Sequence, residues 1–254
     1  MKKKRLPVVF LLAAVAAVGI YAGMRYRREV YLPEQAMQAD EAQLHMLIEE
    51  IRPELPETVQ TAEQDLLAEA RSGCADVVAW IQIPDTQIDY PVVQAEDNAF
   101  YLDHGPDRAE NRLGTPFLDC RCLPDFSGFT SIVYGHHSTK KRMFTQICDF
   151  RNPQFFAQHR TGRLILGAEV RTVRFFAYLN VKSNAPVYHT VFLTEDEKKD
   201  YLAMLLSEAL YKEDVQPETL ADSHLLLLST CSYEFDNARG VLAGVIGEPE
   251  VPQQ

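Results

Sequence analysis

The residues of this chain that could do chemistry stand at the ends of short apolar runs. Residues 225–230 begin with four leucines and lead to Cys231, and Arg239 follows eight residues later. A second run, residues 131–135, is apolar and β-branched, ends in glycine and leads directly to His136. An isolated thiol at a strand end, with a histidine and a fixed cation nearby, can act as a nucleophile in a site that stabilises an oxyanion. Together these residue types indicate acyl transfer.

Cys231 also has a purely structural interpretation. Free cysteines are among the most buried residue types, so a lone cysteine after four leucines could equally be a core residue. A thiol with a pKa of about 8.5 is mostly protonated at neutral pH, and a nucleophilic Cys231 therefore needs a cationic neighbour. His136 and Arg239 are the candidates, and the presence of both favours the chemical interpretation.

These residues resemble the signature of the sortases, the membrane-anchored cysteine transpeptidases of Gram-positive cell surfaces. In that family a glycine precedes the catalytic histidine, a TLxTC strand carries the catalytic cysteine, and the next strand carries an arginine. Gly135-His136, residues 227–231 and Arg239 match these places, except that Leu227 occupies the first threonine position. Leu227 lies four residues before the cysteine, so we expect altered packing there rather than lost chemistry.

The likeness is closest to the class B sortases and covers roughly residues 77–247. It implies a mainly β fold, an eight-stranded sortase-type β-barrel with N-terminal helices and inserted helices. The matching segments are WIQIPDTQIDYPVVQ at 80–94, Asp97-Asn98 with Tyr101-Leu102, and YGHH at 134–137.

The resemblance also implies a role for each residue of the trio. Cys231 would attack a peptide carbonyl and form a thioester, His136 would protonate the leaving amine, and Arg239 would bind the substrate backbone and the oxyanion. Arginine suits that role because it stays charged and offers several donors in a fixed plane. His137 competes with His136, but successive side chains on a strand point to opposite faces, so only one can face Cys231. The Gly-His order of the family selects His136.

Seven further residues are expected to contact the substrate, again by likeness to class B enzymes. Some would lie beside the first residues of the bound peptide, and others would border the active site or face the oxyanion. Each could instead be an ordinary residue of the barrel. The seven are Asn98, Leu102, Tyr134, Ser183, Tyr188, Ser229 and Thr230.

The activity implied by the resemblance is transpeptidation. The protein would cleave a C-terminal sorting signal of NPxTx-like form after its threonine, in a secreted protein, and would transfer the acyl group to an amine of a peptidoglycan precursor or cross-bridge. Alternatives are a pilin-polymerising sortase that uses a lysine amine and a cysteine endopeptidase that releases the acyl group to water. An anchored adhesion or scaffold domain is the non-enzymatic alternative. The chemistry requires no cofactor.

The amino-acid composition limits the classes of partner that the protein can bind. The net charge is −11 although seven basic residues lie near the N-terminus, so the rest of the chain is strongly acidic and a nucleic-acid partner is excluded. Five cysteines are an odd number. Cys120-Arg121-Cys122 lacks the second ligand pair of a zinc site, so we expect no metal and mostly free thiols.

Residues 6–24 form an uncharged stretch between basic residues 2–5 and the arginines at 25, 27 and 28. This length can cross a bilayer core of about 30 Å as a helix. A cleaved signal peptide is the alternative, but the stretch is long for one. We expect a single-pass anchor in the cell membrane, with the catalytic part outside a Gram-positive cell. Basic residues on both flanks leave the charge argument for orientation weak.

The character of the sequence changes near residue 77. Before it, apolar spacing predicts one helix that ends before Pro53 and a second that ends at Ser72-Gly73. The two helices could form a plain stalk, but the resemblance to class B sortases implies that they pack on the barrel. After it, short β-branched runs predict eight strands and two inserted helices, the first broken at Asn152-Pro153. The strands are 77–83, 88–93, 115–119, 130–134, 163–167, 170–181, 224–230 and 240–246, and the helices are 142–159 and 195–211. The expected domains are a membrane anchor at 1–28, helices at 29–73 and the catalytic barrel at 74–254.

Overall fold

The structure is a computed structural model that describes residues 18–53, 65–138 and 143–250. It divides into two compact units, residues 1–43 and 44–254, which are described separately. In the first unit, residues 18–26 are helical, and a π-helical turn, η1 (Arg27–Tyr31), leads into α2 (Leu32–Glu50). Within the described ranges, no helix is both long and apolar enough to cross a membrane. The expected span starts at Leu6, and its residues 6–17 lie outside the described part of the chain.

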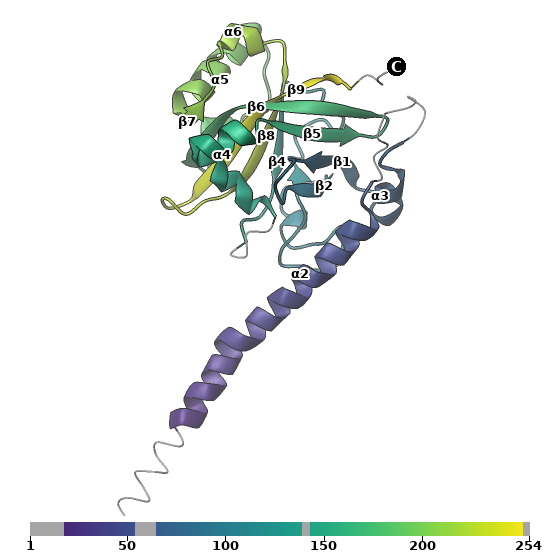
Figure 1. Cartoon of the computed structure of the whole chain (residues 1–254), viewed down its shortest axis with the longest axis vertical. Coiled ribbons are helices and arrows are strands. Elements are labelled where there is room, and N and C mark those ends of the chain that lie inside the picture. The colour runs from purple at the N-terminus through teal and green to yellow at the C-terminus, as the bar shows by residue number, and fades with distance from the viewer. Residues whose placement is uncertain (1–17, 54–64, 139–142, 251–254) are drawn as a thin grey trace, which may run out of the picture. The chain divides into compact units, whose positions relative to one another are not determined.

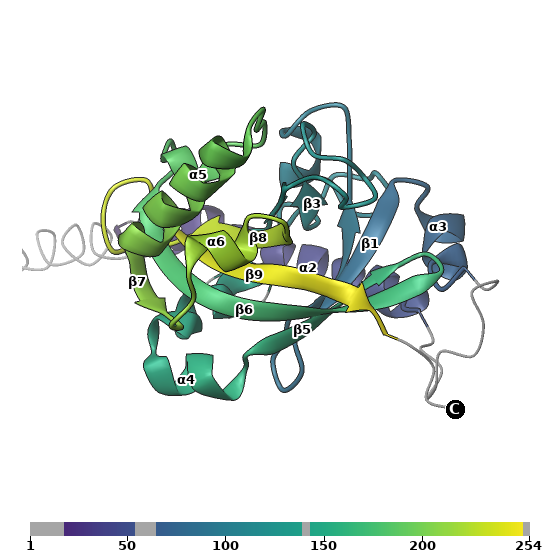
Figure 2. The same cartoon turned by 90° about the horizontal axis from the view of Figure 1, so that it is seen from above.

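The second unit is built on a closed β-barrel (Figures 1 and 2). Its strands follow the order β5-β1-β2-β3-β4-β8-β9-β6, and a further pairing of β5 with β6 closes the ring. The sequence predicts the same eight strands, so this expectation is confirmed. The barrel strands are β1 (Val77–Gln82), β2 (Asp89–Val93), β3 (Phe117–Leu118), β4 (Thr130–Tyr134), β5 (Thr161–Leu166), β6 (Glu169–Lys182), β8 (His224–Cys231) and β9 (Ala238–Pro249).

A ninth strand, β7 (Ala209–Lys212), pairs only with β6 and lies outside the ring. The sequence predicts a helix over 195–211, and the last three residues of that prediction are wrong. The helix itself, α5 (Glu195–Glu208), begins as expected, because the hydroxyl of its N-cap Thr194 accepts a hydrogen bond from the amide of Glu197 at 3.2 Å.

The predicted helix over 142–159 is two shorter elements. A 3₁₀ helix, η3 (Phe144–Arg151), is followed by α4 (Pro153–Gln158). Asn152 separates them and caps α4, since its side-chain oxygen accepts from the amide of Gln154 at 2.9 Å. The remaining short helices are η2 (Phe100–Leu102), α3 (Ala68–Gly73), η4 (Pro186–Tyr188) and α6 (Pro217–Leu220).

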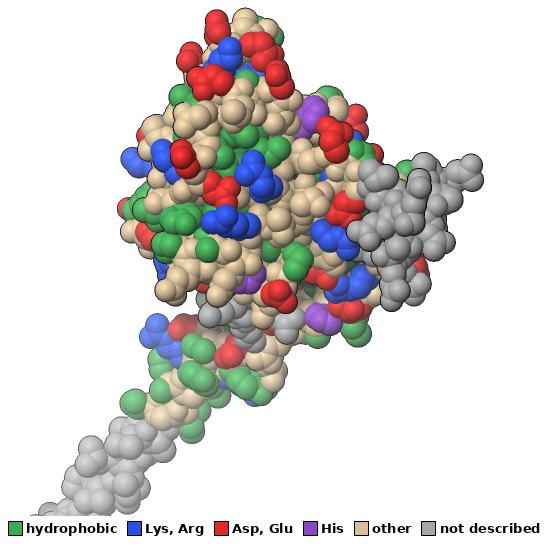
Figure 3. All heavy atoms as spheres, turned by 45° about the horizontal axis from the view of Figure 1, so that its top comes forward, with side chains coloured by type: hydrophobic (Ala, Val, Ile, Leu, Met, Phe, Trp, Pro, Cys, Tyr) green, Lys and Arg blue, Asp and Glu red, His purple; other side chains and the backbone are tan. Residues whose placement is uncertain are grey.

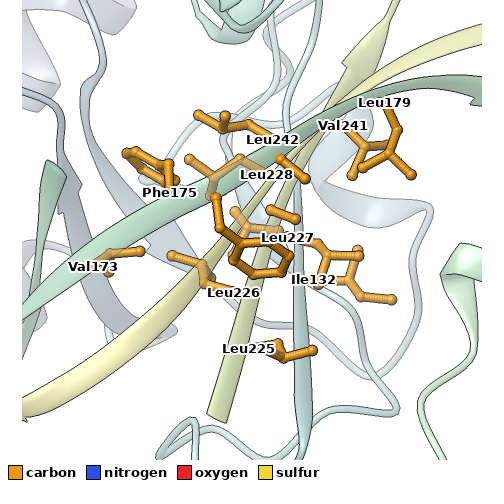
Figure 4. Close-up of a cluster of buried hydrophobic side chains, with 14 of the residues drawn as sticks. Ile132, Val173, Phe175, Leu179, Leu225, Leu226, Leu227, Leu228, Val241 and Leu242 are labelled. Atoms are coloured by element: carbon orange, nitrogen blue, oxygen red, sulfur yellow. The ribbon is translucent and has the colours of Figure 1, made fainter. Parts of the chain in front are cut away.

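The leucine run explains why β8 lies at the centre of the barrel wall. β8 pairs with β4 on one side and β9 on the other, and Leu225, Leu226, Leu227 and Leu228 are all 0% exposed. Figure 4 shows these side chains gathered with apolar residues of β4, β6 and β9. Because both faces of β8 are covered, its sequence is continuously apolar rather than alternating. Leu227 pairs with Ile132 and Ala243 and is ordinary core.

A second apolar cluster joins the start of this unit to the barrel. Leu44, Ile48 and Ile51, which share one helical face, are buried with Leu67 against Trp80 of β1. The expected packing of these helical residues on the barrel is therefore confirmed from Leu44 onward. On the outside of the molecule, acidic side chains gather at the top of the view in Figure 3, where α5 and α6 lie, and basic side chains are scattered below them.

Candidate active site

Strand pairing brings the three predicted catalytic residues to one edge of the barrel. Cys231 is the last residue of β8 and lies opposite Arg239 of β9 in an antiparallel register. β4 runs parallel to β8 with Tyr134 opposite Ser229. His136 follows Tyr134 by two residues, and Cys231 follows Ser229 by two residues. Because the two strands are parallel neighbours, His136 and Cys231 lie side by side at the same edge.

A pocket of about 350 Å³ opens at this edge. Its wall contains all ten residues that the sequence analysis selects, and three that it does not. The ten are Asn98, Leu102, Tyr134, His136, Ser183, Tyr188, Ser229, Thr230, Cys231 and Arg239, and the additional three are Phe117, Arg121 and Gly135. We refer to this cavity as the signal pocket.

His136 is held by its ring nitrogen. The Nε2 atom lies 2.5 Å from the backbone oxygen of Leu102. A carbonyl oxygen can only accept, so Nε2 carries the hydrogen and the Nδ1 atom of the neutral ring is free to take a proton. Only glycine fits at the preceding position, Gly135, because a Cβ atom there would lie 2.6 Å from the Phe144 ring of η3. The glycine lets β4 end close against η3 and so fixes where His136 begins.

His137 points away from the signal pocket, as the strand alternation predicts. Its ring meets that of Tyr233 edge to face at 5.0 Å, and it lines a different cavity. Burial lowers the pKa of His137, an effect that the nearby carboxylates of Glu234 and Asp149 partly oppose. The structure thus places His136, and not His137, in the pocket with Cys231.

The five cysteines are free, and their surroundings differ. Cys74, Cys122 and Cys148 are buried. Burial raises the pKa of the thiols of Cys122 and Cys148 to about 11, which keeps both neutral. Cys120 is exposed. Cys231 lines the signal pocket with His136 and Arg239. Cys148 lines a different pocket with His137 and Arg151, but its thiol is buried and stays protonated.

Arg121 is the main residue that the sequence analysis misses. Its guanidinium binds the carboxylate of Asp119 through Nε at 2.9 Å and Nη2 at 2.7 Å, and Nη2 also donates to the backbone oxygen of Tyr188 at 3.3 Å. Asp119 is fully buried and also accepts the Tyr134 hydroxyl at 2.9 Å. Burial disfavours the charge of Asp119, but the hydrogen bonds from Arg121 outweigh it and lower the pKa to about 2. Arg121 therefore joins two walls of the signal pocket from a buried anchor.

Three hydroxyl groups complete the wall beside Cys231. The Tyr188 hydroxyl and the Ser229 hydroxyl lie 2.9 Å apart, which ties η4 to β8. The Thr230 hydroxyl is buried and has no hydrogen-bond partner within the described residues. The Thr230 hydroxyl is therefore a potential donor, next in the chain to Cys231, that no described residue uses.

Comparison with known proteins gives one consistent result, although no family model matches the chain. Sortase B of Listeria monocytogenes is 29% identical over 177 residues, which cover 70% of this chain and 71% of the relative. The solved sortase B of Clostridium perfringens is 28% identical with a TM-score of 0.65, and covers 70% of this chain and 97% of that one. The solved sortase B from the type II pilus of Streptococcus pneumoniae is 32% identical with a TM-score of 0.59, and covers 72% and 97%.

Proposed function

Because the chain belongs to the class B sortases, which are cysteine transpeptidases, we propose that it joins secreted proteins to an amine of the cell wall through a thioester on Cys231. The signal that it cleaves is a C-terminal sorting signal of NPxTx-like form, cut after threonine. The observation that carries this proposal is the shared pocket of Cys231, His136 and Arg239, three residues that come from three different strand ends.

In the first half of the reaction, the Cys231 sulfur attacks the threonine carbonyl. The carbonyl π electrons move to oxygen, and the Arg239 guanidinium stabilises the oxyanion. When the tetrahedral intermediate collapses, the C–N bond breaks and protonated His136 gives its proton to the leaving amine. The products are a thioester on Cys231, a released C-terminal peptide and a neutral His136.

In the second half, an acceptor amine attacks the thioester carbonyl. A C–N bond forms, the C–S bond breaks, and Cys231 leaves as the thiolate. Neutral His136 is in the state that takes the proton that the attacking amine loses, which restores the starting protonation. Arg239 serves the second oxyanion as it served the first.

The signal peptide is proposed to lie in the signal pocket. Asn98 and Leu102 would meet its first residues, Ser183 and Tyr188 would add to that end of the pocket, and Tyr134, Ser229 and Thr230 would border the reacting carbonyl. The hydroxyl, amide and guanidinium groups in the wall support binding of an extended peptide backbone, which needs donors and acceptors along its length.

A second candidate is polymerisation of pilin subunits, in which a lysine amine is the acceptor. The observation that favours it is the 32% identity to a sortase B from a type II pilus. An endopeptidase that releases the acyl group to water shares the thioester step and differs only in what attacks it.

We further propose that the protein works at the surface of a Gram-positive cell. The apolar stretch at residues 6–24 supports a single membrane-spanning anchor, with residues 29–73 leading to a catalytic part at 74–254.

The test uses the full chain purified in detergent and an NPxT-type peptide. Mass spectrometry should find the acyl group on Cys231, and triglycine, diaminopimelate or a lysine amine should yield a ligated product. If only hydrolysed peptide forms with all three amines, and none speeds turnover of the thioester, the endopeptidase replaces the transpeptidase. If no acyl group appears on Cys231, the proposed mechanism is wrong.

A further inference from the structure

A second pocket, of about 420 Å³, adjoins the end of the barrel where the signal pocket opens. Its wall is made by the residues that directly follow the reactive pair in the chain. His137 comes after His136, and the segment 232–234 comes after Cys231, while the opposite wall is η3. Because side chains alternate along a strand, residues next to His136 and Cys231 face a different space from theirs. The two pockets therefore share no lining residue, although residues that are consecutive in the chain at the ends of β4 and β8 line one pocket and the other.

Among the described residues that line this second pocket, one negative charge has no counter-charge. Asp149, Glu234 and Arg151 all line it. Arg151 is ion-paired with Glu234 at 2.7 Å. The carboxylate of Asp149 has no ion pair or side-chain hydrogen bond in residues 18–53, 65–138 and 143–250. His137 adds no compensating charge, because burial favours its neutral form. The pocket thus suits a ligand that carries a positive charge.

The proposed transpeptidation needs a second binding site, for the acceptor amine. The acylated signal still occupies the signal pocket when the acceptor arrives, so the acceptor must approach the thioester from another side. Free amines are protonated in water at neutral pH, so the acceptor arrives as an ammonium. A carboxylate near the thioester would bind this ammonium before it loses its proton. A cavity of this volume can hold the end of a peptide chain.

We propose that this second pocket binds the acceptor substrate as a primary ammonium at the end of a short peptide chain, with Asp149 as its counter-ion. The inference rests on the proposed transpeptidase function. Asp149 holds the ammonium near the end of β8 and takes no part in bond making. The bound ammonium first gives one proton to water, and the neutral amine then attacks the Cys231 thioester. As the C–N bond forms and the C–S bond breaks, neutral His136 takes the second proton and Cys231 leaves as the thiolate.

The test measures how the thioester is divided between amine and water. The ratio of ligated to hydrolysed product does not depend on how fast the thioester forms, because both products arise from it. The full chain would be compared with Asp149→Asn, Asp149→Glu and the control Asp196→Asn, at subsaturating triglycine, diaminopimelate or a lysine amine. Asp196 lies on α5, its side chain is 94% exposed, and it lines neither pocket.

We expect the ratio to fall about tenfold in Asp149→Asn, which is the lower range for loss of a hydrogen bond to a charged group. The Asp149→Glu variant should recover part of it, and Asp196→Asn should match the wild type. The hydrolysed product itself shows that each variant is folded. A ratio in Asp149→Asn equal to that of the wild type, or an equal fall in Asp196→Asn, overturns the acceptor pocket alone. A wild-type chain that forms no thioester overturns the proposed function and the acceptor pocket with it.

Discussion

Cys231 and Arg239 form the last residue pair of the antiparallel register between β8 and β9. Neighbouring residues in such a pair share one face of the sheet. One connection, residues 232–237, is therefore enough to present a thiol and a guanidinium to the same pocket, and the position of each depends on the other's strand. Substitutions at this edge give the sharpest tests of the proposed chemistry.

Replacement of the proposed nucleophile should abolish turnover. We expect Cys231→Ala to form neither thioester nor product, because no other thiol in the described ranges shares the pocket. Exposed Cys120 is the matched control, and Cys120→Ala should keep its rate within about twofold. Peptide cleavage with acyl-enzyme mass spectrometry measures both. Detection of the acyl group on another cysteine would contradict the assignment.

Substitution of the two adjacent histidines should have clearly different effects on activity. His136→Ala should lose about 10²–10⁴-fold in kcat/KM, the usual cost of removing a proton-transfer group. His137→Ala should stay within about tenfold, because its ring faces the other cavity and contacts Tyr233. Steady-state kinetics on the same peptide decides the matter. A larger loss at His137 would reverse the roles.

Catalysis should depend on the planar shape of the Arg239 guanidinium as well as on its charge. Loss of an oxyanion donor costs about 10²–10³-fold, and we expect this from Arg239→Ala. Arg239→Lys should recover little, because an ammonium is a point charge without the planar fork. Arg171→Lys is a control at a barrel arginine that pairs with Glu169. Near-normal kcat in Arg239→Lys would show that charge alone suffices.

Asp119 should contribute stability that depends on pH. Its pKa is depressed to about 2, so the contribution is complete above the unfolded value near 4 and is lost as the pH falls through the folded value. Asp119→Asn should thus lower the free energy of unfolding by about 2 kcal/mol at pH 7, and the difference from wild type should shrink between about pH 4 and 2. Urea denaturation at several pH values measures this.

The matched control for this variant is Asp196→Asn on the exposed surface of α5, which should show no such pH dependence. A difference between wild type and Asp119→Asn that stays constant down to pH 2 would mean that the carboxylate charge is not the source. Arg121 would then not be held by ion pairing with Asp119.

Gly135 should be intolerant of even one methyl group. A Cβ at this position would lie 2.6 Å from the buried Phe144 ring, and overpacking of this kind costs about 1–3 kcal/mol. We expect Gly135→Ala to destabilise the protein in chemical denaturation and to slow peptide cleavage by displacing His136. Gly128→Ala is the control, because its nearest contact would be an ordinary 3.6 Å. Equal stability of the two variants would contradict this account.

The sequence predicts the barrel well because each strand has its own signal of apolar or β-branched residues between turns. The end of α5 is different, since Ala209-Leu210-Tyr211 fits a helix as well as a strand, and only pairing with β6 makes it β7. Helical spacing likewise does not distinguish the 3₁₀ helix η3 from an α-helix.

The trio is predictable because its members follow recognisable strands and match a family pattern. Arg121 is not predictable in this way. It lies in a loop without periodicity, and its significance comes from Asp119 beneath it and the Tyr188 carbonyl across the pocket, which are distant in sequence or hidden until the barrel closes. Contacts of this kind carry no local pattern.

The pairing of β4 with β8 sets an order of assembly. Between these two parallel strands, the described part of the chain contains β5, β6, β7, three α-helices and two 3₁₀ helices, and β9 comes after both. A chain that emerges N-terminus first exposes His136 long before Cys231 and Arg239, and pairings between such distant segments form slowly. A half-made or unfolded chain therefore contains the thiol only as an ordinary cysteine. The proposed nucleophile would thus gain its histidine and arginine partners only when the barrel closes, so an incomplete chain would carry no competent acyl-transfer site.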